Sequence, residues 1–220
     1  MADIQLQTIS TIDAIRQMIE RDIYSLHFLP GDKIVESDLS RRYGVSRNTL
    51  REAIAYLQAS GILMKIPNKG VFVKKISSSD VQQIFNLRAL LECEAVKELI
   101  QTNKDTSILN KCASNIEIQN ELGEWHDSMN ADIEFHETLI RLSENERLQR
   151  LYDCVLPEVK LCIFQSKAFS TINPENAKQH RLLVNYIEQR DIDKAQNILM
   201  YHINSAVNAY VLGLLNQTGL

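Results

Sequence analysis

Four residues in the second half of the chain have the types and spacing of metal ligands. Asp132 precedes His136 by four positions, so on a helix both side chains project from one face about one turn apart. His180 and His202 fall on two further segments with helical periodicity. One carboxylate and three imidazoles suit zinc, nickel, manganese or iron. From spacing alone a structural interpretation stays open, because a histidine on an amphipathic helix is more often a surface or core residue.

The same residues could instead activate water in a metallohydrolase. The segment 136–140 nearly spells the HExxH signature of zinc peptidases, but Ile140 stands where the second histidine belongs. The neighbouring acids, Glu134 and Glu137, both point away from Asp132 on a helical wheel, which leaves the site without a well-placed general base. The sequence therefore predicts that the protein is not an enzyme.

A second group of residues has the chemistry of a DNA contact. The segment 41–51, RRYGVSRNTLR, carries four arginines and no acid, which is the local charge that a polyanion attracts. Arginine can donate two hydrogen bonds to guanine, and asparagine can form two with adenine. The candidate DNA-contacting residues are Ser46, Arg47, Asn48, Thr49 and Arg51 at one helix N-terminus, with Lys65 and Lys69 on the hairpin that follows.

Charge and composition divide the chain into two parts with different tasks. Residues 1–75 carry 11 Lys and Arg against 8 Asp and Glu, whereas residues 76–220 carry 13 against 20.

A hydrophobic content of 45% with only 7 Gly and 4 Pro excludes a disordered or collagen-like chain. We find neither an apolar run near the roughly 20 residues of a membrane helix nor a secretory leader, and expect a cytoplasmic protein without a membrane segment. The four cysteines form no CxxC pair and are expected to be buried thiols.

The elements that position these residues can be predicted from periodicity and from turn residues. The first part is expected to fold as a winged helix-turn-helix, with its elements at residues 9–27 (helix), 33–35 (extended), 37–43 (helix capped by Ser37), 46–61 (helix capped by Ser46) and 62–75 (hairpin). The second part is expected to be an all-α antiparallel bundle, with helices at 79–102, 105–122, 124–143, 146–169, 174–190 and 192–216. The chain is thus mainly α, with domains 1–75 and 81–220 joined by a linker at 76–80.

The first part resembles the winged helix-turn-helix of the GntR family of bacterial transcription regulators. The resemblance covers residues 29–75 and rests on PGDKIVESDLSRRYGVSRNTLREAI and on the GI...P.KG.FV hairpin. It implies that Arg47 and Arg51 contact operator DNA, that Glu36 orients the arginines, and that Gly70 lies at the tip of the wing.

The second part resembles the FCD ligand-binding domain of the FadR-type branch of that family, a bundle of six or seven helices. The matching pieces lie at 88–92 (R..LE), 132–136 (D..FH), 145, 179–181 (QHR), 190–195 (RDIDKA) and 200–202 (MYH). The resemblance implies that Asp132 and the three histidines bind a divalent metal, with zinc the first choice, and that a small organic acid binds beside it. Arg88 is the candidate counter-charge for that carboxylate, or else the partner of Glu92 in an i,i+4 salt bridge.

Together these observations predict a homodimeric, DNA-binding transcriptional regulator, a repressor, that binds double-stranded operator DNA and responds to a small carboxylate effector. Two copies are expected because a helix-turn-helix protein reads two half-sites. A DNA-binding dimer whose metal site is structural or empty stays as the alternative.

Overall fold

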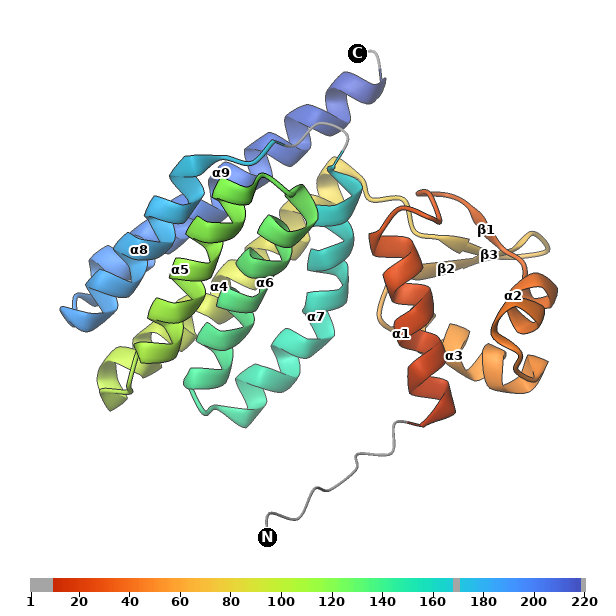
Figure 1. Cartoon of the computed structure of the whole chain (residues 1–220), viewed down its shortest axis with the longest axis horizontal. Coiled ribbons are helices and arrows are strands. Elements are labelled where there is room, and N and C mark those ends of the chain that lie inside the picture. Colours follow the sequence, from red (N-terminus) through yellow and green to blue (C-terminus); the bar gives the residue numbers. More distant parts are fainter. Residues whose placement is uncertain (1–9, 168–170, 219–220) are drawn as a thin grey trace, which may run out of the picture. The chain divides into compact units, whose positions relative to one another are not determined.

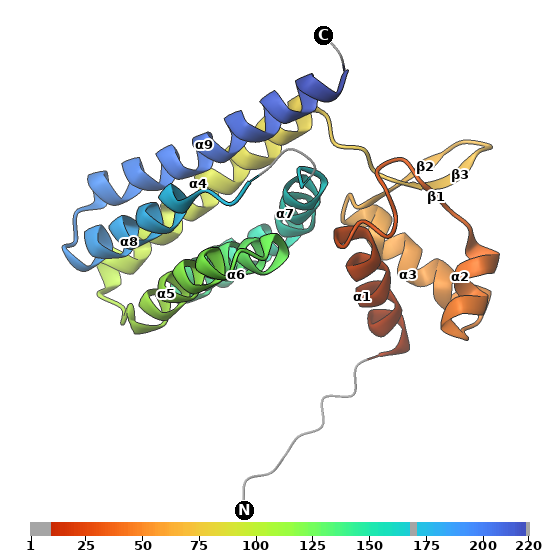
Figure 2. The same ribbon diagram turned by 45° about the horizontal axis from the view of Figure 1, so that its top comes forward.

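The chain forms two compact units, which divide after Lys75 and which we describe separately. The computed structural model describes residues 10–167 and 171–218. Within these ranges the structure is mainly α-helical, with one small sheet in the first unit (Figures 1 and 2). No helix in the described ranges is long and apolar enough to cross a membrane.

The first unit is a winged helix-turn-helix. Its elements are α1 (Thr11–Tyr24), β1 (Lys33–Ile34), α2 (Glu36–Tyr43), α3 (Arg47–Ala59), β2 (Leu63–Ile66) and β3 (Gly70–Val73). Apolar side chains from α1 and α3 form its core, among them Ile19, Leu50 and Leu57, each with an exposed fraction of 0%. Gly44 ends α2 with φ at 66°, a left-handed conformation that glycine adopts without steric cost.

Two local predictions for this unit need correction. Helix α2 begins at Glu36, and its N-cap is Val35 with no side-chain hydrogen bond, so Ser37 lies inside the helix and does not cap it. The extended segment at residues 33–34 is also more than a connection, because it pairs antiparallel with β3 and makes the hairpin a three-stranded sheet in the order β1-β3-β2. The cap of α3 is as predicted: the Ser46 side chain accepts a hydrogen bond from the Thr49 N–H at 3.1 Å.

The second unit is an antiparallel helical bundle. Its helices are α4 (Ser78–Thr102), α5 (Ser107–Leu122), α6 (Trp125–Leu142), α7 (Glu146–Gln165), α8 (Pro174–Glu188) and α9 (Ile192–Thr218). The long helices α4 and α9 run side by side in opposite directions, as Figure 2 shows. The Gln196 side chain donates to the Cys93 carbonyl near one end of this pair, and Phe85 packs edge-on against Tyr210 near the other.

Three expectations for this unit differ from the structure. The predicted linker extends too far, because residues 78–80 form the first turn of α4, closed by a capping box between Ser77 and Asp80. Helix α7 ends at Gln165, and the expected end at 169 lies outside the described residues. Two of the four cysteines are buried, but Cys93 is partly exposed and Cys154 is exposed.

Candidate metal centre and nucleic-acid interface

The four predicted metal ligands come together in the interior of the bundle. Asp132 and His136 lie one turn apart on α6, His180 comes from α8 and His202 from α9, and one ligand atom from each lies within 4.8 Å of all the others. The Nε2 atom of His136 is 3.2 Å from Nε2 of His180 and 3.3 Å from Nε2 of His202. Asp132 Oδ1 lies 3.2 Å from His180 Nε2 and 3.6 Å from His202 Nε2. All four side chains are buried.

Each histidine is oriented by a hydrogen-bond acceptor at its other ring nitrogen. The acceptors of the three Nδ1 atoms are Glu92 Oε2 for His136 at 2.7 Å, the Asn176 carbonyl for His180 at 2.6 Å, and Gln179 Oε1 for His202 at 2.9 Å. We therefore assign the proton of each neutral imidazole to Nδ1, which leaves a lone pair on every Nε2. Three lone pairs and a carboxylate then point at one another across distances at which they repel, unless a cation lies between them.

The ionisation of these groups agrees with a cation site. Burial alone would raise the pKa of Asp132, but the contacts of its carboxylate with His180 and with the other two imidazoles hold that pKa well below its usual range. Burial lowers the pKa of His136 and His202, and neighbouring positive groups lower it further. These directions give an ionised Asp132 and neutral His136 and His202, which are the forms that bind a metal. For tetrahedral zinc with Zn–N distances of 2.0–2.1 Å, neighbouring ligand atoms lie about 3.3 Å apart, close to the shorter separations here.

Behind the cluster lies a buried network that the sequence did not predict as a whole. The Glu92 carboxylate accepts from Arg88 Nε at 2.7 Å and from the Tyr152 hydroxyl at 3.0 Å, besides its contact with His136. Burial would raise the pKa of Glu92, but the Arg88 charge and His136 lower it to about 2. Of the two roles considered for Arg88, the structure shows the ion pair with Glu92, at an exposed fraction of only 2%.

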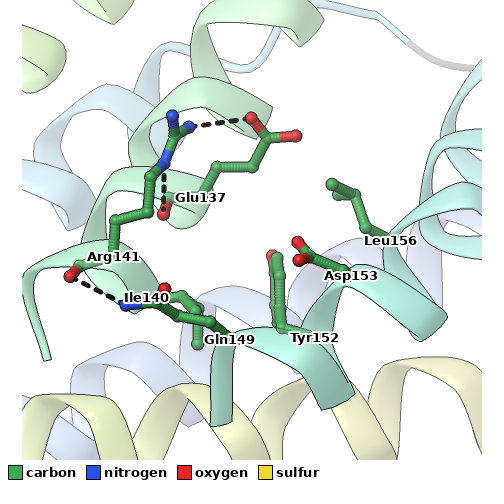
Figure 3. Close-up of a pocket in the computed structure, with 7 residues that line it drawn as sticks. All are labelled: Glu137, Ile140, Arg141, Gln149, Tyr152, Asp153 and Leu156. Carbon is green, nitrogen blue, oxygen red and sulfur yellow. Dashed lines mark hydrogen bonds and ion pairs between the residues drawn. The ribbon is translucent and has the colours of Figure 1, made fainter. Parts of the chain in front are cut away.

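Two hollows lie near this interior. A narrow one reaches Asp132 and is lined by uncharged polar side chains, including Asn120, Ser128, Asn173 and Asn176. A wider pocket of about 270 Å³ lies between α6 and α7 (Figure 3). The wider pocket contains no metal ligand, but Tyr152, which lines it, donates to Glu92.

In the first unit the predicted DNA-contacting residues gather at the N-terminus of α3 and on the β2–β3 hairpin. Arg47, Asn48 and Arg51 are exposed, as are Lys65 and Lys69. Arg47 and Asn48 form no side-chain hydrogen bond or ion pair with any described residue, which leaves their donors available to a ligand.

Three further predicted residues of this surface have structural tasks. Ser46 and Thr49 hydrogen-bond to each other through their hydroxyl groups at 2.8 Å and close the first turn of α3. Gly70 follows the hairpin turn with φ at 113°, and a Cβ there would lie 3.1 Å from Lys33 Cε. A side chain at position 70 would therefore strain the wing.

Three side-chain contacts orient the helices that carry this surface. Glu36 Oε2 accepts from Arg51 Nε at 2.7 Å, which joins α2 to α3. On the other side, the buried Asp22 of α1 accepts from the Tyr43 hydroxyl and pairs with Arg42, each at 3.0 Å. Partial burial and this hydrogen bond raise the pKa of Tyr43 to about 12, so the phenol remains a donor at neutral pH.

Comparison with known proteins assigns both units. Residues 11–73 match the family of bacterial regulatory proteins, gntR family, and residues 83–205 match the FCD domain. The Nta operon transcriptional regulator of Aminobacter aminovorans is 30% identical over 81% of this chain and 84% of its own length. The HTH-type transcriptional repressor RspR of Escherichia coli K12 is 24% identical over 86% of this chain and 84% of its own.

Solved structures show the same fold. The structure of a GntR transcriptional regulator from Rhodococcus sp. RHA1 superposes with a TM-score of 0.81 at 21% sequence identity. The alignment covers 92% of this chain and 98% of the Rhodococcus chain. The structure of McbR/YncC of E. coli superposes with a TM-score of 0.79 at 15% sequence identity, and the alignment covers 92% of this chain and 97% of the McbR/YncC chain.

A winged helix-turn-helix followed by an FCD helical bundle defines a DNA-binding transcriptional regulator, and not an enzyme. The chain belongs to the gntR family of bacterial regulatory proteins and carries an FCD domain.

Proposed function

We propose that the protein is a homodimeric repressor whose bundle binds a divalent metal and a small carboxylate effector, and that the effector changes its affinity for operator DNA. The observation that carries the proposal is the buried convergence of Asp132, His136, His180 and His202. The domain roles follow: residues 1–75 bind DNA, and residues from 81 onward sense the effector and dimerise. Since its partner is genomic DNA, the protein would act in the cytoplasm.

The chain's own residues explain why a metal fits. Asp132 and the three Nε2 atoms are held at short mutual distances, and Glu92, Gln179 and the Asn176 carbonyl fix the imidazole orientations. When bound, a divalent ion supplies positive charge and a coordination position for a carboxylate. We favour zinc, because nitrogen and oxygen donors at these separations match its bond lengths, while nickel, manganese and iron accept the same donors.

We place the effector beside Asp132, where the narrow hollow has a volume of about 10 Å³, room for about one water, so that an organic acid binds there only if the lining side chains move apart. The lining of this hollow offers amide and hydroxyl groups from Asn120, Ser128, Asn173 and Asn176, which can hydrogen-bond an organic acid. Arg88 is the proposed counter-charge for the effector carboxylate, and its Nε also donates to Glu92 in the network that orients His136.

On the DNA side we assign base contacts to Arg47 and Asn48 and phosphate contacts to Arg51, Lys65 and Lys69. The first two are exposed at the N-terminus of α3, where a recognition helix meets base edges, and they have no described partner to compete with DNA. Ser46 and Thr49 hold the helix end, and Gly70 allows the wing to turn.

One observation favours a second candidate function, a DNA-binding dimer with a structural metal. Four protein ligands, all buried, suffice to close a tetrahedral zinc site, and closed sites are typical of structural zinc. In that case the ion would hold α6, α8 and α9 together without binding an effector.

The experiment that separates the two combines metal analysis with DNA binding. The metal content of untagged wild-type protein is compared with that of the His180→Ala protein, and operator DNA is obtained by selection from random sequence. A metal bound by the wild type alone, together with a carboxylate that changes operator affinity only in the metal-loaded wild type, supports sensing. A metal whose loss unfolds the bundle, with operator affinity insensitive to a panel of carboxylates, supports the structural role.

A further inference from the structure

The wider pocket between α6 and α7 has an apolar floor and a charged rim (Figure 3). Its floor is formed by Ile140 and Tyr152, each with an exposed fraction of 2%, and by the half-buried Leu156. Arg141 on α6 and Asp153 on α7 are exposed at its rim. The volume of about 270 Å³ lies just below the roughly 300–1,000 Å³ that is usual for drug-sized ligands, so the pocket has room for a small metabolite.

The rim carries an excess charge of each sign. The Glu137 carboxylate is paired twice, because Oε2 accepts from Arg141 at 3.0 Å and Oε1 accepts from Lys160 at 2.9 Å. One carboxylate between two cations leaves this group with one positive charge in excess. Asp153, by contrast, forms no hydrogen bond or ion pair with any described residue. The pocket therefore offers a positive group from one helix and an unpaired carboxylate from the other.

Both charges have hydrogen-bonding atoms to spare. Arg141 uses its Nε and Nη2 atoms on the carbonyl and carboxylate of Glu137, and its Nη1 atom has no described partner. Gln149 lies one turn before Asp153 on the same face of α7. The Gln149 amide nitrogen donates to the Arg141 carbonyl at 3.2 Å, which leaves the amide oxygen for a ligand. A carboxylate needs donors and an ammonium needs acceptors, and the pocket supplies both.

We propose that this pocket binds a small α-amino acid with an apolar side chain, in its zwitterionic form. The ammonium group of the ligand lies at the Asp153 carboxylate and the Gln149 amide oxygen, and its carboxylate accepts from Arg141 Nη1. The apolar side chain packs on the floor. This site is separate from the carboxylate effector proposed above and uses none of the four metal ligands.

A larger hollow in the bundle shows that volume alone does not make such a site. It measures about 380 Å³ and lies between the α4–α5 loop and the end of α8. Its four charged lining residues all have partners within the chain: Lys104 with Glu144, Asp105 with Ser107, Glu188 with Thr106 and Asn110, and Arg190 with Asn103. Of these two hollows, the α6–α7 pocket alone presents an unpaired charge to a ligand.

Tyr152 connects the pocket with the proposed metal centre. Its ring is part of the floor, and its hydroxyl donates to Glu92, which in turn contacts His136. An amino acid packed on the ring restricts this side chain and, through it, the carboxylate that orients His136. The link rests on the proposed function, whereas binding of the amino acid does not.

Isothermal titration of the full-length protein with three molecules that share one apolar body tests the site. L-Leucine carries both charges, 3-methylbutylamine lacks the carboxylate, and 4-methylpentanoate lacks the ammonium group. Leucine should bind at least about tenfold more tightly than either, because it alone forms both charge-assisted contacts. Leucine that binds no more tightly than the amine or the acid would contradict the zwitterion.

Substitutions on the exposed rim separate the two charges. Asp153→Asn should weaken the binding of leucine and of the amine about tenfold, and Arg141→Gln should weaken leucine equally but leave the amine unaffected. Glu137 keeps Lys160 as its partner in the Arg141→Gln protein. Glu146→Gln removes an exposed acid of α7 outside the pocket and is the matched control, which should bind leucine as the wild type does. If Asp153→Asn binds leucine as tightly as this control, the ligand lies elsewhere and the inference is wrong.

The cobalt-substituted protein tests the link through Tyr152 and separates this inference from the proposed function. Saturating leucine should shift the visible absorption bands of the wild type but not of Tyr152→Phe, which keeps the ring and loses the hydroxyl. Titration checks that Tyr152→Phe still binds leucine. Bound leucine with an unchanged wild-type spectrum overturns the link. A protein that binds leucine at Asp153 but no cobalt overturns the metal centre and supports the pocket, and cobalt binding without leucine binding does the reverse.

Discussion

The two functional regions of this regulator are built on opposite principles. The proposed DNA-contacting surface comes mainly from neighbouring residues on one helix end, and its main side chains, Arg47 and Asn48, are exposed and have no described partner. The proposed metal centre draws on three helices and on residues as distant as Asp132 and His202, all buried. The first region is ready to bind without further organisation, whereas the second exists only once the bundle has formed.

The difference is also one of internal support. At the metal centre every imidazole Nδ1 already has an acceptor, and Glu92 in turn is held by Arg88 and Tyr152. Such outer partners fix ligand orientation in advance and strengthen metal binding. At α3 the support is limited to the cap at Ser46 and to the Glu36–Arg51 pair. Changes at the metal centre should therefore affect folding and binding together, while changes on α3 should affect DNA binding alone.

The largest effect is expected from removing a metal ligand. His180→Ala should weaken metal binding by more than about 100-fold, because even the loss of an outer partner costs 10–100-fold. Competition with a chromogenic chelator measures the affinity. His126→Ala, on α6 but outside the cluster, is the control and should keep the wild-type value. Equal metal affinity in both variants would show that the cluster does not bind the ion.

A smaller change beside the same site tests the hydrogen-bond network that orients His136. Glu92→Gln should weaken metal binding by about 10–100-fold, because His136 Nδ1 loses its carboxylate acceptor. The absorption spectrum of the cobalt-substituted protein should shift as well, which a loss of bundle stability alone would not cause. Glu94→Gln, exposed on the same helix, is the matched control. An unchanged affinity and spectrum in Glu92→Gln would reduce the network to a structural role.

On α3 we expect a substitution of an exposed arginine to reduce the discrimination between operator and altered DNA while the fold stays intact. Arg47→Ala should cost about 1–3 kcal/mol of preference for operator over a sequence changed at one base pair. Arg51→Ala should weaken binding to both sequences alike and lower the salt slope by about one. Fluorescence anisotropy at several salt concentrations measures both quantities. The docking assignment fails if Arg47→Ala discriminates as the wild type does.

The same contrast explains what the sequence could predict. The recognition helix was predictable because its signals are local: Gly44, the Ser46 cap and the arginine spacing all lie within a few residues. The bundle helices followed from periodicity and from the scarcity of Gly and Pro, although the predicted linker ran into the first turn of α4 and α7 ends at Gln165, earlier than expected.

The metal centre was predictable only where a motif existed. Asp132 and His136 share a helix face, but joining them to His180 and His202 depended on family resemblance. Glu92 was considered only as a partner of Arg88, because nothing local reveals that α4 brings its carboxylate to His136. Tyr152 had no signal, and Gln179 entered only as part of the QHR match with no role assigned, since their contacts cross between helices.

The smallest expected effect compares two serines that the sequence treats alike. Both Ser37 and Ser46 precede helix-forming residues, but only Ser46 accepts a hydrogen bond from a backbone N–H of its helix, whereas Ser37 donates to Asp38 at 3.3 Å. Ser46→Ala should lower the local stability of α3 by about 1 kcal/mol, and Ser37→Ala should change α2 by a few tenths at most. Hydrogen exchange of the full-length protein, followed at the amides of α2 and α3, measures both. Equal losses in the two variants would mean that the first turn of α2 has a side-chain cap after all, and that its local signals resemble those of α3 more closely than the structure indicates.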